Sequence, residues 1–227
     1  MRYLILIGLS LMLFPSCEKE DPLKLPVDLA FSIKMNKNLK VNNTMVFTKG
    51  EIILADFEFE GEREIGEDVY FSKEFSSGLS IDLTNDEKIQ ELTFEIPQGI
   101  YKRIYIAFNT FDDFDQNCIV IEAYYTNTQD VQIPIRFEFL SSEYFSVVAE
   151  DYSGDSQIVL NTNTPAYASI RLDPVYWFMN ISNTMLDDSE TVTINGKATI
   201  LINEDINTRL YELIVARLDE STECVFF

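Results

Sequence analysis

A two-residue alternation of apolar and polar side chains constrains this chain more than any other feature. It is clearest between residues 131 and 139, where every second residue is branched or aromatic: Val131, Ile133, Ile135, Phe137 and Phe139. Shorter runs with the same alternation occur at 29–35, 53–60, 92–96, 104–108 and 168–172. Because successive strand side chains point to opposite faces, each run predicts a strand with one buried side. Repeated short strands separated by turn residues predict a mainly β fold, an antiparallel β-sandwich.

Prolines and glycines refine this expectation. Pro134 lies on the polar side of its run and cannot donate a ladder hydrogen bond, so the run is expected to be an edge strand. Pro97-Gln98-Gly99 separates two runs and is expected to form a turn. Asn195-Gly196 is a strong signal for a two-residue hairpin.

The last part of the chain, 174–227, has a different pattern. Pro174 can start a helix and is followed by an aromatic cluster. Asn203 can cap a second helix, in which apolar residues recur at helical spacing: Ile206, Leu210, Leu213, Ile214 and Leu218. The pattern predicts an amphipathic C-terminal helix of about four turns. Its apolar stripe is expected to pack against the sandwich, and a partner-binding helix is the alternative.

The first sixteen residues are typical of an export signal. Arg2 is followed by an apolar run from Tyr3 to Phe14, which is shorter than the roughly 20 residues that a membrane-spanning helix needs. Ser16-Cys17 closes the signal, and a small residue before cysteine resembles the cleavage site of bacterial lipoproteins, although Phe14 stands where leucine is usual. We therefore expect a lipid on Cys17 and membrane attachment through it. A plain secretory signal is the alternative.

Lys19-Glu20-Asp21 follows the cysteine almost directly. These residues resemble the export tag of Bacteroidota surface lipoproteins, and the resemblance implies an outer-membrane protein exposed at the cell surface. A periplasm-facing lipoprotein with an ordinary charged tether is the alternative. The expected organisation is a signal peptide (1–16), an acidic, proline-containing tether (17–27), the sandwich (28–173) and a helix-hairpin-helix extension packed on it (174–227).

Four local features between Gly50 and Phe139 carry a second resemblance. They are Gly50-Glu51-Ile52, the segment Gly78 to Leu83, the segment Ile96 to Tyr101 and the strand Ile133 to Phe139. Together they resemble an uncharacterised family of bacterial surface domains, similar to prealbumin-like or immunoglobulin-like sandwiches. The resemblance implies a fold, but no activity and no functional residue.

Charge and composition exclude several functions. A net charge of −21 repels phosphate backbones, so nucleic acid is not an expected partner. The chain has no histidine, which removes Ser/His and Cys/His mechanisms and most zinc sites. Because 38 acidic residues make chance pairs inevitable, no catalytic carboxylate pair stands out. No enzyme activity and no cofactor are expected, and a carboxylate-dependent hydrolase is a distant alternative.

Two sets of residues are candidates for covalent or metal chemistry. With Cys17 lipidated, Cys118 and Cys224 remain, either as a disulfide or as two separate buried thiols. Asp113, Asp115 and Asn117 repeat the first oxygen ligands of a calcium loop, but Cys118 and Tyr124 occupy the places of its glycine and closing glutamate. An acidic loop is therefore expected, with a weak calcium site as the alternative.

Four aromatic residues could stack against a sugar if they are exposed: Tyr124, Tyr125, Tyr176 and Trp177. Core packing is the more frequent use of such residues. The expected function is a non-catalytic binding module for a glycan, protein or matrix partner. A structural or assembly subunit of an envelope complex or fibre is the alternative.

The lipid assignment has a direct test. Cys17→Ala removes the thiol that carries the lipid, so the variant should lose palmitate labelling and leave the membrane fraction. A control, Cys118→Ala, should keep both. Continued labelling of Cys17→Ala would refute the assignment.

Overall fold

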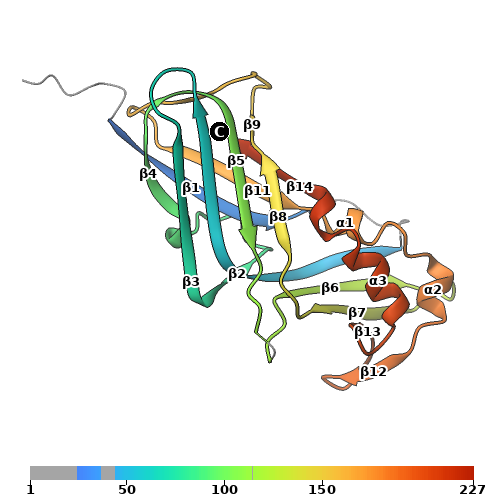
Figure 1. The fold of residues 1–227 in the computed structure, drawn as a ribbon. Helices are drawn as coiled ribbons and strands as arrows, with labels where there is room; N and C mark the ends of the chain where they lie inside the picture. Colours follow the sequence, from blue (N-terminus) through green and yellow to red (C-terminus); the bar gives the residue numbers. More distant parts are fainter. Residues whose placement is uncertain (1–24, 37–43, 114) are drawn as a thin grey trace, which may run out of the picture.

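The computed structural model describes residues 25–36, 44–113 and 115–227, and strands dominate these residues. One sheet has five strands in the order β4 (Thr93–Pro97), β1 (Pro26–Met35), β11 (Ala166–Leu172), β14 (Thr222–Phe226) and β9 (Glu150–Asp151). We call it the five-stranded sheet. It is open at both edges (Figure 1).

The second sheet has nine strands, and seven of them follow one another: β10 (Ile158–Leu160), β5 (Gly99–Asn109), β2 (Met45–Arg63), β6 (Ile119–Thr126), β7 (Gln132–Phe139), β13 (Lys197–Ile202) and β12 (Thr191–Ile194). Two more strands, β3 (Val69–Asp82) and β8 (Tyr144–Val148), pair with β2 and β5. Three short helices complete the described fold: α1 (Pro174–Trp177), α2 (Asn183–Asp187) and α3 (Thr208–Val215). The expectation of a mainly β fold is confirmed.

Strand β2 belongs to two parts of the nine-stranded sheet. Its residues 45–52 pair with β6, its residues 58–63 pair with β5, and β3 pairs with 51–61. The register shifts between Phe47 and Lys49 and again between Leu54 and Asp56. Such bulges bend a strand. In Figure 1 the first part of β2 accordingly lies with β6 and β7, and the second part with β3 and β5.

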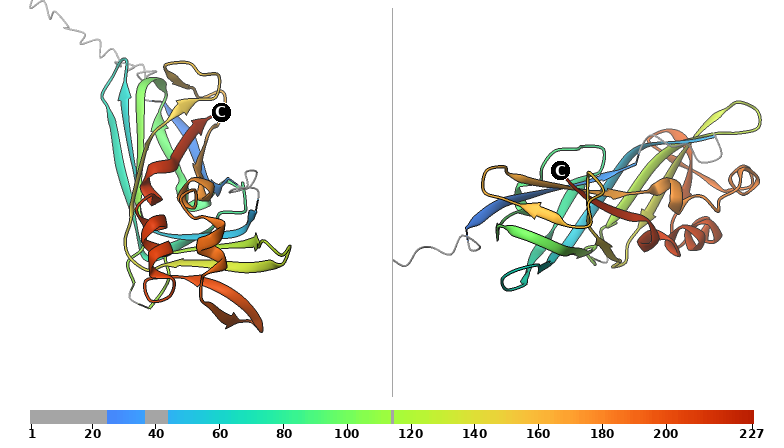
Figure 2. Two further views of the ribbon diagram at one scale, coloured as in Figure 1. Left: turned by 90° about the vertical axis from the view of Figure 1, so that its right-hand side faces the viewer. Right: turned by 90° about the horizontal axis from the view of Figure 1, so that it is seen from above.

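The core is built differently on the two parts of β2. In the β5 part, rings from the five-stranded sheet meet the inner face of β2, with Phe31 of β1 and Phe57 of β2 at 4.9 Å between centroids. In the β6 part, helical segments cover the same inner face. The ring centroid of Phe178, which follows α1, lies 5.3 Å from that of Phe47 and 6.0 Å from that of Phe137. The ring of Tyr211 of α3 also packs on Phe137. The helices accordingly gather beside β6, β7 and β13 (Figure 2).

The expected strand phases are largely confirmed. The inward residues of the runs starting at Leu29, Ile104 and Ala168 are all buried. In β2 the alternation of inward and outward side chains is interrupted at the bulge around Ala55. Leu54 and Phe57 are therefore both completely buried, although an unbroken alternation would place them on opposite faces.

The edge position expected for Pro134 is wrong. Strand β7 lies between β6 and β13, and β13 pairs with residues 135–137. The β13 ladder thus begins one residue beyond Pro134. The missing N–H therefore costs no hydrogen bond of that ladder.

The C-terminal part differs from the expectation in two ways. The four-turn helix is not confirmed, because α3 covers Thr208–Val215. The Asn203 side chain accepts hydrogen bonds from the N–H groups of Asp205 and Ile206, and Asn207 has a left-handed backbone with φ of 55°. Residues 174–227 also supply β12 and β13 to one sheet and β14 to the other, in addition to the helices.

The two expected turns have different roles. Asn195 and Gly196, with φ of 50° and 78°, join β12 to β13 as the expected two-residue hairpin. Pro97-Gln98-Gly99 instead carries the chain from one sheet to the other. The Tyr101 hydroxyl donates to the Pro97 carbonyl at 2.6 Å, and the Arg63 guanidinium donates to the Gln98 carbonyl at 2.7 Å. None of the helices within the described ranges is long and apolar enough to cross a membrane.

The close approach of Gly61 to Tyr101 yields a stability prediction. A Cβ at Gly61 would lie 2.6 Å from Cε1 of the fully buried Tyr101 ring. Gly61→Ala should therefore lower the free energy of unfolding by about 1–3 kcal/mol, measured by urea denaturation. Glu62→Ala, an exposed neighbour in the same strand, should stay within about 0.5 kcal/mol of the parent. Equal stabilities of the two variants would contradict the packing described.

Candidate functional site

The outer face of the nine-stranded sheet, opposite the helices, carries two adjoining hollows of about 170 and 490 Å³. They share the lining residues Glu122 and Arg136, so they adjoin at these two side chains and are treated together as one site. We call it the outer groove, and its principal residues are Thr48, Lys49, Asp82, Glu122, Tyr124, Arg136 and Lys197. The groove is the candidate binding site.

Strand alternation and register bring the central residues together. In β6, Ile121 and Ala123 face the core, so Glu122 and Tyr124 face outward. Glu122 lies directly opposite Arg136 of β7. In this way the alternation selects which residues face the groove, and the register selects their neighbours.

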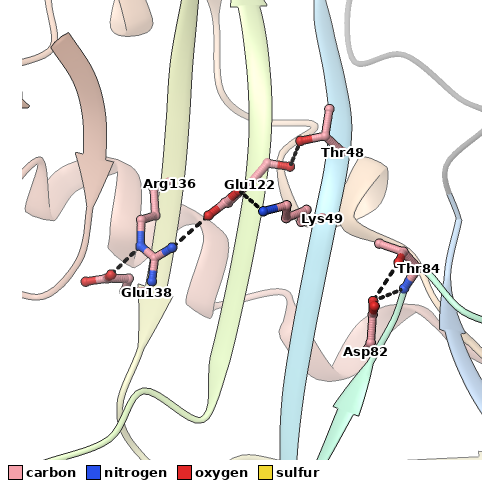
Figure 3. A network of polar contacts seen from close by, with 7 residues as sticks. All are labelled: Thr48, Lys49, Asp82, Thr84, Glu122, Arg136 and Glu138. Atoms are coloured by element: carbon pink, nitrogen blue, oxygen red, sulfur yellow. Dashed lines mark hydrogen bonds and ion pairs between the residues drawn. The ribbon is translucent and has the colours of Figure 1, made fainter. Parts of the chain in front are cut away.

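The first bulge of β2 adds two residues at this place. Lys49 pairs with Glu122, whereas Thr48 is the extra residue that the bulge leaves without a partner in register. The Thr48 hydroxyl donates to the Glu122 carbonyl at 3.2 Å. Figure 3 shows both residues of β2 beside Glu122.

A chain of ion pairs crosses the middle of the groove (Figure 3). The Arg136 guanidinium donates from Nη1 to Glu122 Oε1 at 2.8 Å and from Nε to the Glu138 carboxylate. Lys49 Nζ lies 3.6 Å from Glu122 Oε2. Arg136 is thus held between two carboxylates, and Glu122 between two cations.

The groove is close to electrical neutrality. Its charged lining comprises three cations, Lys49, Arg136 and Lys197, and three carboxylates, Glu51, Asp82 and Glu122. Their formal charges sum to 3 − 3 = 0, or to −1 when Glu138, the second carboxylate partner of Arg136, is included, in a chain of net charge −21. A surface of this kind offers donors and acceptors side by side without strongly favouring either sign of charge.

The far end of the groove is polar and internally hydrogen-bonded. Asp82 Oδ1 accepts from the backbone N–H and the hydroxyl of Thr84 at 2.8 and 2.6 Å (Figure 3). The Ser80 hydroxyl donates to Glu51 Oε1 at 2.7 Å. These contacts fix the positions of the carboxylates at this end.

Of the four aromatic residues selected from the sequence, Tyr124 lines the groove and is 37% exposed. Trp177 and Tyr125 are completely buried, so a stacking role for them is wrong. Trp177 packs near Phe145, and the Tyr125 hydroxyl donates to Asp187 Oδ1 at 2.8 Å. Burial, together with that hydrogen bond to a carboxylate, raises the pKa of Tyr125 to about 12.

Tyr176 is half-buried, and the Arg217 guanidinium lies 4.2 Å from its ring centroid. One face of this ring is therefore already occupied by a cation. Its hydroxyl donates to Glu220 at 3.3 Å. Tyr176 consequently offers a sugar much less surface than Tyr124 does.

The disulfide between Cys118 and Cys224 is not formed, and both are buried free thiols. Cys118 precedes β6, and its thiol lies 2.9 Å from the Ser141 carbonyl, whereas Cys224 belongs to β14 of the other sheet. Burial raises the pKa of the Cys224 thiol to about 12 and also raises that of Cys118. Both thiols are thereby kept protonated and unreactive.

The remaining candidates do not join the groove. Asp113 Oδ1 accepts from the backbone N–H of Asp115 at 3.3 Å. The residues that the structure describes contain no group of three His, Cys, Asp or Glu side chains that could hold a metal ion. Cys17 and the tag Lys19, Glu20 and Asp21 lie outside the described residues. Their roles stay predictions.

Sequence reasoning selected Tyr124 but missed Lys49, Glu122, Arg136 and Lys197. Their polar positions within alternating runs were visible, for example Arg136 between Ile135 and Phe137. Nothing in the sequence indicated that Glu122 lies opposite Arg136. No protein-family model matches the chain, and no curated protein matches it.

The ion pairs of Arg136 yield a second stability prediction. Arg136→Met keeps the apolar stem but leaves the half-buried carboxylates of Glu122 and Glu138 without their shared cation. The free energy of unfolding should fall by about 1–2 kcal/mol at neutral pH, as measured by urea denaturation. Arg171→Met, which breaks the exposed pair with Glu223, is the matched control and should change stability by less than about 0.5 kcal/mol. Equal losses of stability in Arg136→Met and Arg171→Met would contradict the stabilising role assigned to the ion pairs of Arg136.

Proposed function

We propose that this chain is an exported, lipid-anchored surface protein whose β-sandwich acts as a non-catalytic binding module, and that its outer groove binds a neutral glycan. One observation carries the proposal: an exposed tyrosine lies in a groove whose charges nearly balance, within a strongly acidic chain.

The chemistry of the groove supports a neutral polyhydroxylated ligand. Tyr124 offers an amphipathic ring on which the apolar face of a sugar could rest. Arg136 and Lys49 supply donors beside it, and Glu122 supplies acceptors. An anionic ligand would be repelled by the net charge of −21.

The same contacts disfavour hydrolysis. A glycosidase of the common type needs one protonated carboxylic acid and one carboxylate on either side of the scissile bond. Here the Arg136 guanidinium hydrogen-bonds both Glu122 and Glu138 and so lies between the two carboxylates, where such an enzyme would hold the glycosidic bond. Binding without catalysis is the simpler use of this site.

Assembly through an exposed sheet edge finds less support. The edge strands β4 and β8 have five residues each, and β12, β10 and β9 have four, three and two. In the longer strand β3, the residues between Glu74 and Leu79 lie opposite Ala55 alone, so a large bulge interrupts its edge. Short or interrupted edges protect a sheet against pairing with a second chain.

The proposed anchor would keep the binding module near the membrane. Pro26, the first residue of β1, is 26 − 17 = 9 residues beyond Cys17. Nine extended residues span about 30 Å at most. Two or more acyl chains on Cys17 would make the attachment stable, because each buried methylene contributes about 0.8 kcal/mol.

The glycan proposal is tested by a neutral-glycan array with the full chain in a neutral detergent, followed by titration of the best ligand. Tyr124→Ala should weaken binding about tenfold, because it removes the stacking surface. Tyr70→Ala is the matched control, since Tyr70 is 66% exposed on β3 and should not affect binding. The proposal would be refuted if no glycan on the array bound, or if Tyr124→Ala and Tyr70→Ala lost affinity equally.

A further inference from the structure

The outer face of the five-stranded sheet carries a row of three aromatic rings in contact, one pair stacked and the other tilted. Tyr167 lies in β11, Phe227 directly follows β14, and Tyr152 directly follows β9, so the rings come from three neighbouring strands. The ring centroids of Tyr167 and Phe227 are 5.7 Å apart, and those of Phe227 and Tyr152 are 5.1 Å apart. We call these three residues the aromatic ladder.

Backbone hydrogen bonds hold the ladder in place. The Phe227 N–H donates to the Tyr167 carbonyl at 2.9 Å, and the Tyr152 N–H donates to the Phe226 carbonyl at 2.9 Å. Tyr152 is nevertheless 74% exposed and Phe227 is 60% exposed. Large aromatic side chains that are positioned in a row and left in water are typical of interaction sites.

The Tyr167 end of the ladder is closed by a cation from the same chain. Lys88 Nζ lies 5.2 Å from the centroid of the Tyr167 ring, within cation–π range. The Tyr167 hydroxyl lies 2.6 Å from Ser32 Oγ and donates to Asp86 Oδ1 at 3.3 Å. Both the face and the hydroxyl of this ring are therefore occupied.

The Tyr152 end is open. Among the residues that the structure describes, Phe227 is the one ring in contact with Tyr152, at an interplanar angle of 33°, and no lysine or arginine lies over the Tyr152 ring. Tyr152 lies in a turn closed by the hydrogen bond from the Gly154 N–H to the Asp151 carbonyl at 2.9 Å. Its acidic neighbours in sequence are Glu150, Asp151 and Asp155, and the sequence from 137 to 170 contains no lysine or arginine.

We infer that the open face of Tyr152 is a binding site for an alkylammonium or guanidinium group, that is, for a lysine or arginine side chain of a basic partner peptide. A cation at this place would meet the negative face of the ring, in a segment that carries Glu150, Asp151 and Asp155 and no basic residue. It would occupy the position that Lys88 holds at the other end of the ladder. Charge complementarity with a chain of net charge −21 selects a basic partner over an acidic one.

This site is separate from the outer groove, because the ladder lies on the five-stranded sheet and the groove on the nine-stranded sheet. Failure of the glycan proposal would leave the cation site intact, and the reverse also holds. The two proposals can therefore be tested independently on the same preparation.

The test uses choline as the cation and 3,3-dimethylbutan-1-ol as its uncharged isostere. The full chain with labelled tyrosine rings is titrated in a neutral detergent and followed by NMR, in about 0.3 M salt to screen diffuse attraction. Choline should shift the Tyr152 ring signals in a saturable manner, and the alcohol should bind about tenfold more weakly. A short peptide with two lysines should compete with choline.

Three variants complete the test. Tyr152→Leu keeps an apolar side chain without the ring quadrupole and should weaken choline binding about tenfold, whereas Tyr152→Phe should stay within about threefold of the parent. Tyr70→Leu, at another exposed tyrosine, should leave binding unchanged. The inference is overturned if the Tyr152 signals do not shift, if choline and the alcohol bind equally, or if Tyr152→Leu binds like the parent. A neutral sugar that shifts the Tyr152 signals where choline does not would also overturn it.

Discussion

The structure depends on one strand that serves two different cores. The inner face of β2 packs against aromatic rings of the five-stranded sheet at Phe57 and against a helical segment at Phe47. Two bulges allow a single strand to satisfy both arrangements, because each extra residue changes the direction of the strand and the face on which later side chains lie. The first bulge also shapes the candidate site, since it places both Thr48 and Lys49 beside Glu122.

The alternation of residue types predicted the strands β1, β2, β4, β5, β7 and β11, because which side chain faces the core is a local property of an extended chain. Phe137, Ile104 and Ile170 were assigned to the core on this basis, and all three are completely buried. Pairing is a long-range property. The register of the strands determines that Lys49 contacts Glu122. The order of the strands determines that β13 pairs with β7, so that β7 is not an edge strand despite Pro134. The length of the C-terminal helix was overestimated, because Asn203 and Asn207 interrupt the backbone where the apolar residues still recur at helical spacing.

The same reasoning explains how much of the candidate site could be found in advance. Tyr124 was selected as an aromatic residue, and its exposure follows from its place one residue after the inward-facing Ala123. Tyr125 was also selected as an aromatic residue, but it is the next residue in the strand after Tyr124 and therefore faces inward. The balanced charges of the groove could not be predicted, because they come from strands far apart in sequence. The proposed cation site was missed for a similar reason, since Tyr152, Phe227 and Tyr167 meet through the order of strands in the five-stranded sheet.

We propose that the outer groove is the place where this protein binds a glycan. Amide hydrogen exchange of the full chain, with and without its best neutral glycan, tests it most directly. Bound glycan should slow exchange in 45–51, 119–124 and 133–137, the three segments that meet at Glu122 and Arg136. Slower exchange confined to other segments, with these three unchanged, would contradict the account.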